Sequence, residues 1–172
     1  MDFFEAVNQR RSIRAFTHQP VGEDKLQRIL EAINRAPSAG NLQAYEVYLV
    51  RDAGLRTALA AAAGNQQFMA QAPIALMFCA HAERAQTRYG TRGTELYSVQ
   101  DATIACTYAM LAATALGLAT VWVGAFDEQA VAKIVGLSPG HRPVAMLPIG
   151  YAAESPHAPK RRPLADIVHE VK

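Results

Sequence analysis

The stretch LYSVQDATIACTYAMLAATAL, residues 96–116, is the longest apolar segment of this 172-residue chain, and the other elements must pack around it. This stretch predicts a helix whose faces are almost all formed by small or apolar residues. The side expected to face the core consists of Val99, Thr103, Cys106, Met110 and Ala113. Gly117 follows directly and is expected to end the helix, because glycine readily adopts the left-handed conformation found there. We therefore expect a central, buried helix.

The segments on either side of this helix alternate between helical and extended patterns. Leu26, Ile29, Leu30 and Ile33 repeat at helical spacing within Glu23–Ala36, and Pro37 ends that run. Further helices are expected over residues 2–9, 55–63 and 127–135, and strands over 45–50, 74–79, 118–123 and 144–149. The polar segment 81–93 shows no helical apolar face and is expected to be a mobile excursion. The pattern predicts an α+β fold with a single sheet.

The C-terminal segment differs from the rest of the chain. Pro156, Pro159 and Pro163 prevent residues 152–163 from forming a helix or a central strand, so an extended course is expected before a last short helix at Leu164–Val171. We interpret residues 1–172 as a single domain, of which 152–172 form an extended C-terminal arm. Such an arm is suited to reach a partner subunit.

Composition excludes several classes of protein. With 17 basic and 15 acidic side chains, the net charge of +2 argues against a nucleic-acid or membrane-surface binder. The first five residues do not resemble a secretory signal, and no apolar run reaches membrane-spanning length, so a cytoplasmic location is expected. Cys79 and Cys106 lie in apolar segments and read as buried small hydrophobes, although a single bridge between them stays possible.

Two cationic clusters lie far apart in the sequence. Arg10-Arg11-Ser12-Ile13-Arg14 follows the first predicted helix, and Lys160-Arg161-Arg162 lies in the arm. Guanidinium groups bind phosphate through paired hydrogen bonds, so the two clusters could form the halves of one phosphate site. The alternative is that both are ordinary solvated surface.

Several familiar catalytic constellations are missing from the sequence. Neither Gly-x-Gly-x-x-Gly nor Gly-x-x-x-x-Gly-Lys-Ser/Thr is present, so a phosphate would have to be bound by side chains. The Gly-x-Ser-x-Gly of a serine hydrolase is also missing. The five histidines never pair at three- or four-residue spacing, which argues against a metal site. We therefore expect no catalytic side chain, and a cofactor that supplies the chemistry.

Five motifs in this order resemble the nitroreductase family of FMN-dependent oxidoreductases. They are Arg10–Phe16, Ala36–Gln43, Gly117 to Asp127, Pro148–Tyr151 and Lys160–Leu164, and together they cover nearly the whole chain. The resemblance implies a nitroreductase-like fold with a central, mostly antiparallel sheet flanked by helices. It also implies an intertwined homodimer with FMN bound between the subunits.

The resemblance also suggests roles for individual residues. Arg10 and Ser12 would contact the FMN phosphate and ribityl chain, Arg11 would make a backbone or secondary contact, and Arg14 would lie near the flavin pyrimidine. Lys160 and Arg162 would close on the phosphate from the arm. Pro37, Ser38, Ala39 and Asn41 would come from the second subunit, and Gly124 and Ala125 would offer backbone N–H groups to the flavin. Asn65 or Gln67 is a further candidate for reading the pyrimidine.

The reaction implied by the resemblance is hydride transfer from NADH or NADPH, through flavin N5, to a nitroaromatic, quinone or similar small acceptor. Two alternatives stay open: a flavin-dependent dehydrogenase or dehalogenase of a specific metabolite, and a non-catalytic FMN-binding or storage protein. The sequence departs from the family after Gln43, where many members have a proline followed by an aromatic residue and this chain has Ala44 followed by Tyr45. It is also short between Ile74 and Leu96, where larger members carry helices over the substrate site.

Overall fold

A four-stranded antiparallel sheet organises the chain in a computed structural model that describes residues 1–171. The strands are β1 (Tyr45–Val50), β2 (Ile74–His81), β3 (Ala119–Thr120) and β4 (His141–Gly150), in the order β1-β2-β4-β3. The central strand β2 is apolar on both faces and almost fully buried, because helices cover both sides of the sheet. The α+β fold class is therefore confirmed.

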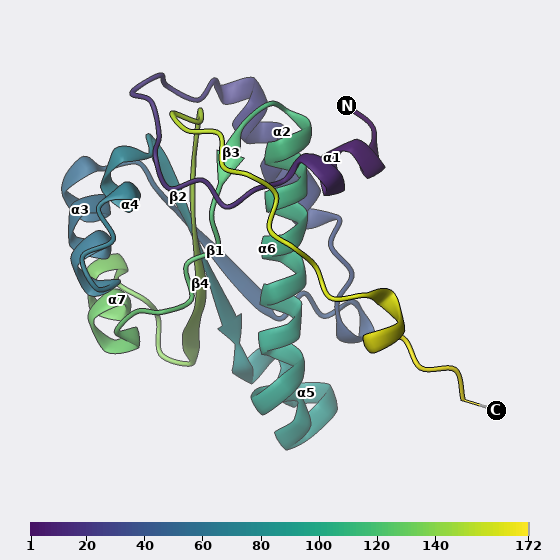
Figure 1. The fold of residues 1–172 in the computed structure, drawn as a ribbon. Coiled ribbons are helices and arrows are strands. Elements are labelled where there is room, and N and C mark those ends of the chain that lie inside the picture. The colour runs from purple at the N-terminus through teal and green to yellow at the C-terminus, as the bar shows by residue number, and fades with distance from the viewer. Residues whose placement is uncertain (172) are drawn as a thin grey trace.

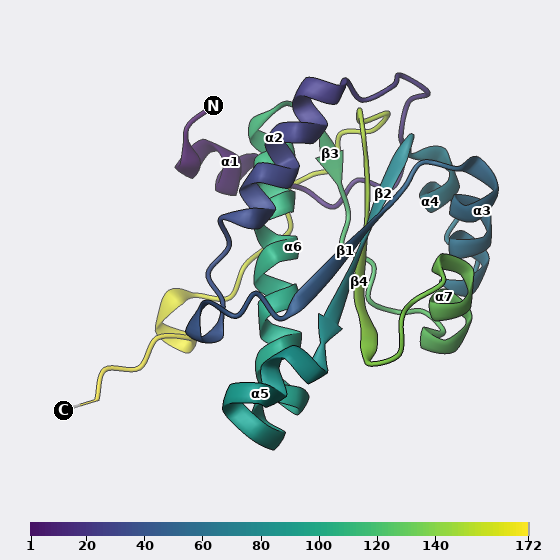
Figure 2. The ribbon, with the colours of Figure 1, turned by 180° about the vertical axis from the view of Figure 1, so that it is seen from behind.

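Helices form one layer on each face of the sheet (Figure 1). On one face lie α2 (Glu23–Asn34) and α6 (Ser98–Ala115), whose apolar side chains pack against Leu76, Phe78 and Leu147 of the sheet. On the other face lie α3 (Ala53–Ala62), α4 (Phe68–Gln71) and α7 (Glu128–Val135). The view from behind shows the same arrangement (Figure 2). The helices of each layer form an apolar cluster with one face of the sheet, so both clusters depend on the same sheet.

The long helix α6 buries a different face from the expected one. Of the expected core positions, Cys106 and Ala113 are buried, but Ala102, Ala105 and Ala109 complete the buried stripe. Because the helix is nearly uniformly apolar, its periodicity does not reveal which side faces the sheet. The alanines let the backbone of α6 pack close to the sheet. Lys25 donates a hydrogen bond of 2.8 Å to the Leu116 carbonyl at its C-terminal end.

The expectation of an irregular excursion at residues 81–93 was wrong. This segment forms α5 (Ala82–Arg92), followed by a π-helical turn at Gly93–Tyr97 that leads into α6. Ala85 is buried, and a side chain at Gly93 would collide with the Ala85 carbonyl oxygen. The few apolar residues thus suffice for a helix because α5 packs at the base of α6 (Figure 1).

Two other elements are shorter than expected. The strand predicted at 118–123 is reduced to β3 and an isolated bridge between Val123 and Met146. The terminal helix predicted at 164–171 is only a 3-10 turn, η3 (Leu164–Asp166). A short amphipathic segment rarely forms a helix in water without a surface to pack on. By contrast, α1 (Phe3–Gln9) begins as predicted, with Asp2 and Glu5 capping it reciprocally.

The arm leaves the body of the protein after Ala153, whose N–H donates a hydrogen bond of 2.9 Å to the Ala15 carbonyl. From Glu154 to Val171 every residue is exposed, and both views show the arm extending away from the rest (Figures 1 and 2). Lys172, the last residue of the predicted arm, lies outside the described residues.

Cys79 and Cys106 are buried free thiols, and burial raises the pKa of Cys79 to about 12, with a smaller contribution from Glu46. No helix of the described chain is long and apolar enough to cross a membrane.

Candidate functional site

The arginine-bearing segment that follows α1 runs extended beside β3. Ile13 donates a hydrogen bond of 3.0 Å to the Thr120 carbonyl, and Ser12 forms a parallel bridge with Thr120. Because side chains alternate along an extended segment, burial of Ile13 on one side leaves Ser12 and Arg14 on the other. The core packing of Ile13 thereby fixes the positions of the neighbouring polar side chains.

This segment and the arm meet at one pocket, although no residue of the Lys160–Arg162 cluster lines it. Arg10, Arg11, Ser12 and Arg14 line a pocket of about 290 Å³, and the arm closes it with Pro156, His157 and Pro159. Two parts of the chain that are distant in sequence therefore form one cavity.

The electrostatics of this cavity suit an anion. Burial, and then the charges of Arg161 and Arg11, lower the pKa of Arg10 from its usual value, although arginine stays protonated. Within residues 1–171, Arg10, Arg11, Arg14 and Arg161 form no salt bridge with a carboxylate. Clustered cations without counter-charges repel one another, and a bound phosphate would relieve that repulsion. The donors present therefore fit the phosphate of a cofactor such as FMN.

The cationic side chains differ in how firmly they are held. Arg11 donates to the carbonyls of Asn8 at 2.6 Å and Arg10 at 2.9 Å, so its guanidinium is held by the backbone at the end of α1. The backbone N–H of Arg14 donates to the Glu154 carboxylate, so this contact holds the arm against the segment. Arg162 donates to the Asp166 carbonyl at 2.6 Å within the arm. The arm residue that influences Arg10 is Arg161, to which the sequence analysis gave no individual role, whereas the expected Lys160 and Arg162 do not line the pocket.

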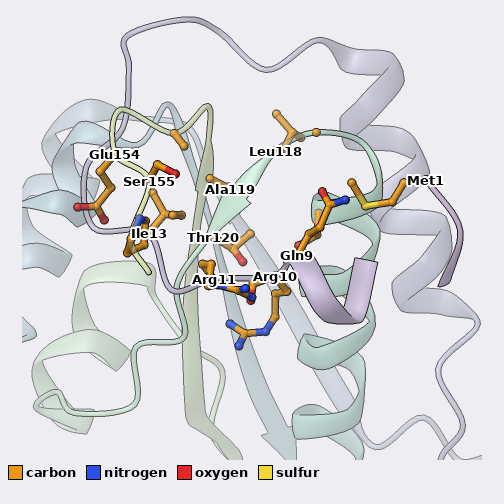
Figure 3. Close-up of a pocket in the computed structure, with 14 residues that line it drawn as sticks. Met1, Gln9, Arg10, Arg11, Ile13, Leu118, Ala119, Thr120, Glu154 and Ser155 are labelled. Atoms are coloured by element: carbon orange, nitrogen blue, oxygen red, sulfur yellow. The ribbon is translucent and has the colours of Figure 1, made fainter. Parts of the chain in front are cut away.

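A second pocket of about 260 Å³ adjoins the first and shares Arg10 and Arg11 with it (Figure 3). Its walls come from the end of α1, from β3 and from the start of the arm. The hydroxyl of Thr120 is buried here and has no hydrogen-bond partner in the described chain. Figure 3 shows Thr120 beside Arg10 and Arg11. A buried hydroxyl without a partner is costly, so this pocket favours a ligand or water that bonds to it.

The loop after α2, residues 37–43, is shaped by a carboxylate that the sequence analysis missed. Asp101 on α6 is buried and accepts hydrogen bonds from the N–H groups of Ala39 at 2.9 Å and Ala44 at 3.2 Å. Ser38 Oγ accepts another from the N–H of Gln43 at 2.9 Å. The available signal was an acidic residue in an otherwise apolar helix, because such a residue is buried only with partners.

Helix α5 holds the same loop from outside. Arg84 Nε donates to the Leu42 carbonyl, and Arg88 donates to the Gly40 carbonyl at 3.5 Å. The backbone at Gly40 has a φ of 55°, and a Cβ there would collide with the Tyr89 hydroxyl. Arg84, Arg88 and Tyr89, which belong to the segment expected to be a mobile excursion, therefore act on the loop.

The loop and the arginine pocket lie at opposite ends of α6. The loop is bonded to Asp101 near the start of the helix. Thr114 and Gly117, near its end, line the second pocket, which shares Arg10 and Arg11 with the first. Pro37, Ser38, Ala39 and Asn41 thus do not line the arginine pocket of their own chain. A shared site would require these residues to come from another subunit.

Gly124 and Ala125 lie in the exposed loop between β3 and α7. The bridge from Val123 to Met146 fixes one end of this loop, and the N–H of Asp127, which donates to the Ala62 carbonyl at 2.9 Å, fixes the other. A Cβ at Gly124 would lie only 3.0 Å from Nε1 of Trp122. Glycine therefore leaves the backbone here open to close approach.

The sheet with its two helical layers defines an α+β protein, and the arginines of its pocket suit an anionic ligand. Comparison identifies the family. The chain belongs to the nitroreductase family, whose model matches residues 7–67 and 54–151.

Similar proteins support this membership. A Bacillus subtilis protein named FMN reductase is 32% identical over 98% of this chain and 73% of its own length. A Thermus thermophilus protein named NADH dehydrogenase is also 32% identical, over 98% of this chain and 95% of its own. The solved structure of an NADPH:FMN oxidoreductase from Vibrio harveyi complexed with NAD+ superposes with a TM-score of 0.91 at 28% identity, covering 99% of this chain and 77% of that one. The nitroreductase-like fold is thereby confirmed.

Proposed function

We propose that this protein reduces small, flat, electron-poor acceptors such as nitroaromatics or quinones with hydride from NADH or NADPH. The broader assignment follows from the family. As a member of it, with relatives named FMN reductase, NADPH-flavin oxidoreductase and nitroreductase, the chain is an NAD(P)H-dependent flavin oxidoreductase with FMN as its cofactor. The observation that supports the proposal is a pocket lined by Arg10, Arg11 and Arg14 and closed by the arm, whose Arg161 lies near enough to lower the pKa of Arg10.

The phosphate of FMN is assigned to this cationic pocket. Arg10 and Ser12, which line the pocket, would donate to it from the body of the protein, with Arg161 adding charge beside Arg10. Lys160 and Arg162, which do not line the pocket in the single chain, would close on the phosphate from the arm. Bidentate guanidinium contacts fix both the position and the orientation of a phosphate. Arg11 supports this arrangement through its bonds to the backbone.

The rest of the cofactor is assigned to neighbouring loops. FMN, when bound, supplies the hydride chemistry, so no side chain is proposed as a catalyst. The backbone N–H groups of Gly124 and Ala125 orient the reactive edge of the ring, and Arg14 provides positive charge near its pyrimidine side. Pro37, Ser38, Ala39 and Asn41 line the ring from the partner subunit, in a loop fixed by the buried Asp101.

A homodimer follows from the same arrangement. Leu164, Ile167 and Val168 of the arm are exposed, and an apolar groove of about 500 Å³ lies between α1 and α6, lined by residues that include Phe3, Tyr108 and Leu111. We propose that the arm of each copy packs on the partner and that residues 1–172 form one domain with 152–172 as this arm. Two free buried thiols and a nicotinamide donor fit a cytoplasmic location.

Titration of the apoprotein with FMN tests the phosphate assignment. Loss of a charge-assisted hydrogen bond costs about 1.5 to 3 kcal/mol, so Arg10→Ala and Arg162→Ala should each weaken FMN binding roughly ten- to a hundred-fold. Arg28→Ala on α2 is the matched control and should bind FMN like the original protein. Equal affinities for all three variants would show that the phosphate lies elsewhere.

Steady-state assays with NADH or NADPH and several acceptors test the reaction itself. An oxidoreductase loses its flavin absorbance when donor is added without acceptor and regains it when a quinone or nitroaromatic follows. A storage protein would bind FMN without donor-dependent bleaching. Turnover confined to one metabolite would instead favour a specialised dehydrogenase or dehalogenase.

A further inference from the structure

Two histidines and a glutamate meet at the end of the sheet that lies away from the arginine pocket. Glu46 lies near the start of β1, His81 ends β2, and His141 begins β4. One ligand atom from each of these side chains lies within 4.8 Å of those of the other two. The strand register explains the juxtaposition: His81 pairs with His141, and Glu46 pairs with Cys79, two residues before His81.

Both imidazoles are already oriented by a hydrogen-bonding neighbour. Nδ1 of His81 lies 3.1 Å from Oε1 of Glu46, and Nδ1 of His141 lies 2.9 Å from the Tyr48 hydroxyl. The ring centroids are 4.6 Å apart, edge to face. When Nδ1 of His141 donates to the Tyr48 hydroxyl, Nε2 of that ring presents its lone pair, which is the arrangement found in metal-binding histidines. Nδ1 of His81 and Oε1 of Glu46 are themselves about as far apart as two ligands of one zinc ion, so these two atoms are the other donors.

The surroundings favour a cation. Glu83 adds a second carboxylate beside the cluster, since its Oε1 lies 3.1 Å from where a Cβ on Gly140 would be. Arg142, the next residue after His141, is held by Glu128 through bonds of 3.1 and 2.8 Å, so its charge is already compensated. The side chain of His81 is 23% exposed and that of Glu46 is 44% exposed, which leaves the donors accessible from solvent.

We propose that Glu46, His81 and His141 bind a divalent transition-metal ion of the zinc class. Two imidazoles and one carboxylate match the donors of three-ligand zinc sites, with a fourth position for water. Imidazole nitrogen favours Zn²⁺, Cu²⁺ or Ni²⁺ over Mg²⁺ or Ca²⁺. Donors about 2.0 to 2.1 Å from zinc lie roughly 3.3 Å apart in a tetrahedral site, so binding requires a small inward rotation of these side chains.

The bound ion ties together three strands and the start of α5. His81 is followed directly by Ala82, the first residue of α5, whose N–H donates to the Gly140 carbonyl at 3.4 Å. Helix α5 in turn holds the loop at residues 37–43 through Arg84 and Arg88. The ion therefore stabilises an end of the sheet that positions this loop, independently of the reaction.

Zinc titration of the full chain, purified without a histidine tag and freed of metal with a chelator, tests the proposal. We expect one Zn²⁺ per chain by calorimetry and, at about 100-fold excess over Kd, a rise in melting temperature of roughly 5 °C or more. His81→Gln and His141→Gln should each weaken Zn²⁺ binding at least tenfold and remove most of that rise. Mg²⁺ at the same concentration should leave the melting temperature unchanged.

The control variant is His18→Gln, which removes an exposed histidine outside the cluster and should bind Zn²⁺ like the original protein. Circular dichroism checks that each variant is folded. Substitution with Co²⁺ gives a second readout, because its visible absorption reports four-coordinate nitrogen and oxygen ligands and should vanish in both cluster variants. Absence of saturable Zn²⁺ binding, or equal binding by folded His81→Gln and His141→Gln, would overturn the proposal.

Discussion

The sheet with its covering helices and the C-terminal arm differ in how they bury apolar side chains. Leu76 and Phe78 of the sheet are fully buried, whereas Leu164 of the arm is 76% exposed. Helix α1 resembles the arm in this respect, because its Phe3 and Phe4 are 63% and 75% exposed. Exposed apolar side chains that lie together mark interaction surfaces, so we propose that the arm and α1 pack on a partner.

Removal of the arm should give the largest effect. Truncation after Tyr151 deletes Lys160 and Arg162 and all the exposed aliphatic residues of the arm, but leaves both apolar clusters of the body intact. We expect a protein that has lost FMN and dissociates or aggregates. Size-exclusion chromatography with flavin absorbance measures both properties. A truncated chain that stayed dimeric and kept FMN would show that the arm is needed neither for dimerisation nor for cofactor binding.

Within the body, Asp101 should be the most sensitive polar residue. Asp101→Ala leaves the N–H groups of Ala39 and Ala44 without an acceptor, at about 1 to 3 kcal/mol each. We expect a loss of about 2 to 4 kcal/mol in the free energy of unfolding, measured by urea denaturation. Asp101→Asn keeps one acceptor oxygen and should recover part of this loss. Equal losses for both variants would mean that helix packing, not the loop, is affected.

The aliphatic residues of the arm should contribute to dimerisation. Replacement of Leu164 and Ile167 by Ser together should weaken the dimer by about 2 kcal/mol, or more than tenfold, because each side chain loses a partly buried contact. Analytical ultracentrifugation measures the dissociation constant. Leu55→Ser changes an exposed leucine of α3 and serves as the control. If this control weakened the dimer as much, the arm would have no special role.

Replacement of Arg14 should change the reduction potential of the bound FMN rather than the affinity for FMN. With its charge near the pyrimidine, Arg14→Gln should lower the two-electron reduction potential by about 30 mV, equivalent to 1.4 kcal/mol. Redox titration of the FMN-saturated variant measures this. A potential equal to that of the original protein would restrict Arg14 to its backbone contact with Glu154.

The smallest effect is expected at the rim of the body, where Arg142 bonds to Glu128 and thereby lowers the pKa of Glu128. A lowered pKa means that the ion pair stabilises the fold above the usual pKa of glutamate, and that this stabilisation disappears as the pH falls through the lowered value. Glu128→Gln should cost at most about 1 kcal/mol at neutral pH, because solvent screens the pair. The difference from the original protein should vanish in acid, as urea denaturation at several pH values would show.

Local signals predicted the body well. The helix α7 lies within the predicted range 127–135, with Asp127 as its N-cap, and β2 contains the strand predicted at 74–79. Helix α5 was missed because its packing at the base of α6 is not visible in its own composition. The terminal helix was predicted from a pattern that needs a surface which the single chain lacks.

Parts of the candidate site were predicted and parts were missed, because contacts between distant segments are not visible in the local sequence. A shared site of the Arg10 and Lys160 regions was inferred from the two cationic clusters. The arm does reach the pocket at Arg10, but through Pro156, His157 and Pro159 and not through Lys160 or Arg162. Asp101 was overlooked because the sequence of an apolar helix does not show which distant N–H groups its single carboxylate will bond to. The pairing of His81 with His141 depends on strand register, so no spacing along the sequence could have revealed it.

Trp122 gives the molecule an optical property of its own. It is the single tryptophan of the chain, and its indole nitrogen faces the open backbone at Gly124. Indole emission overlaps flavin absorption, so an FMN ring held at Gly124 would quench the fluorescence of this residue by energy transfer. The protein therefore contains a built-in reporter, and the brightness of one side chain should follow cofactor occupancy in real time without any label.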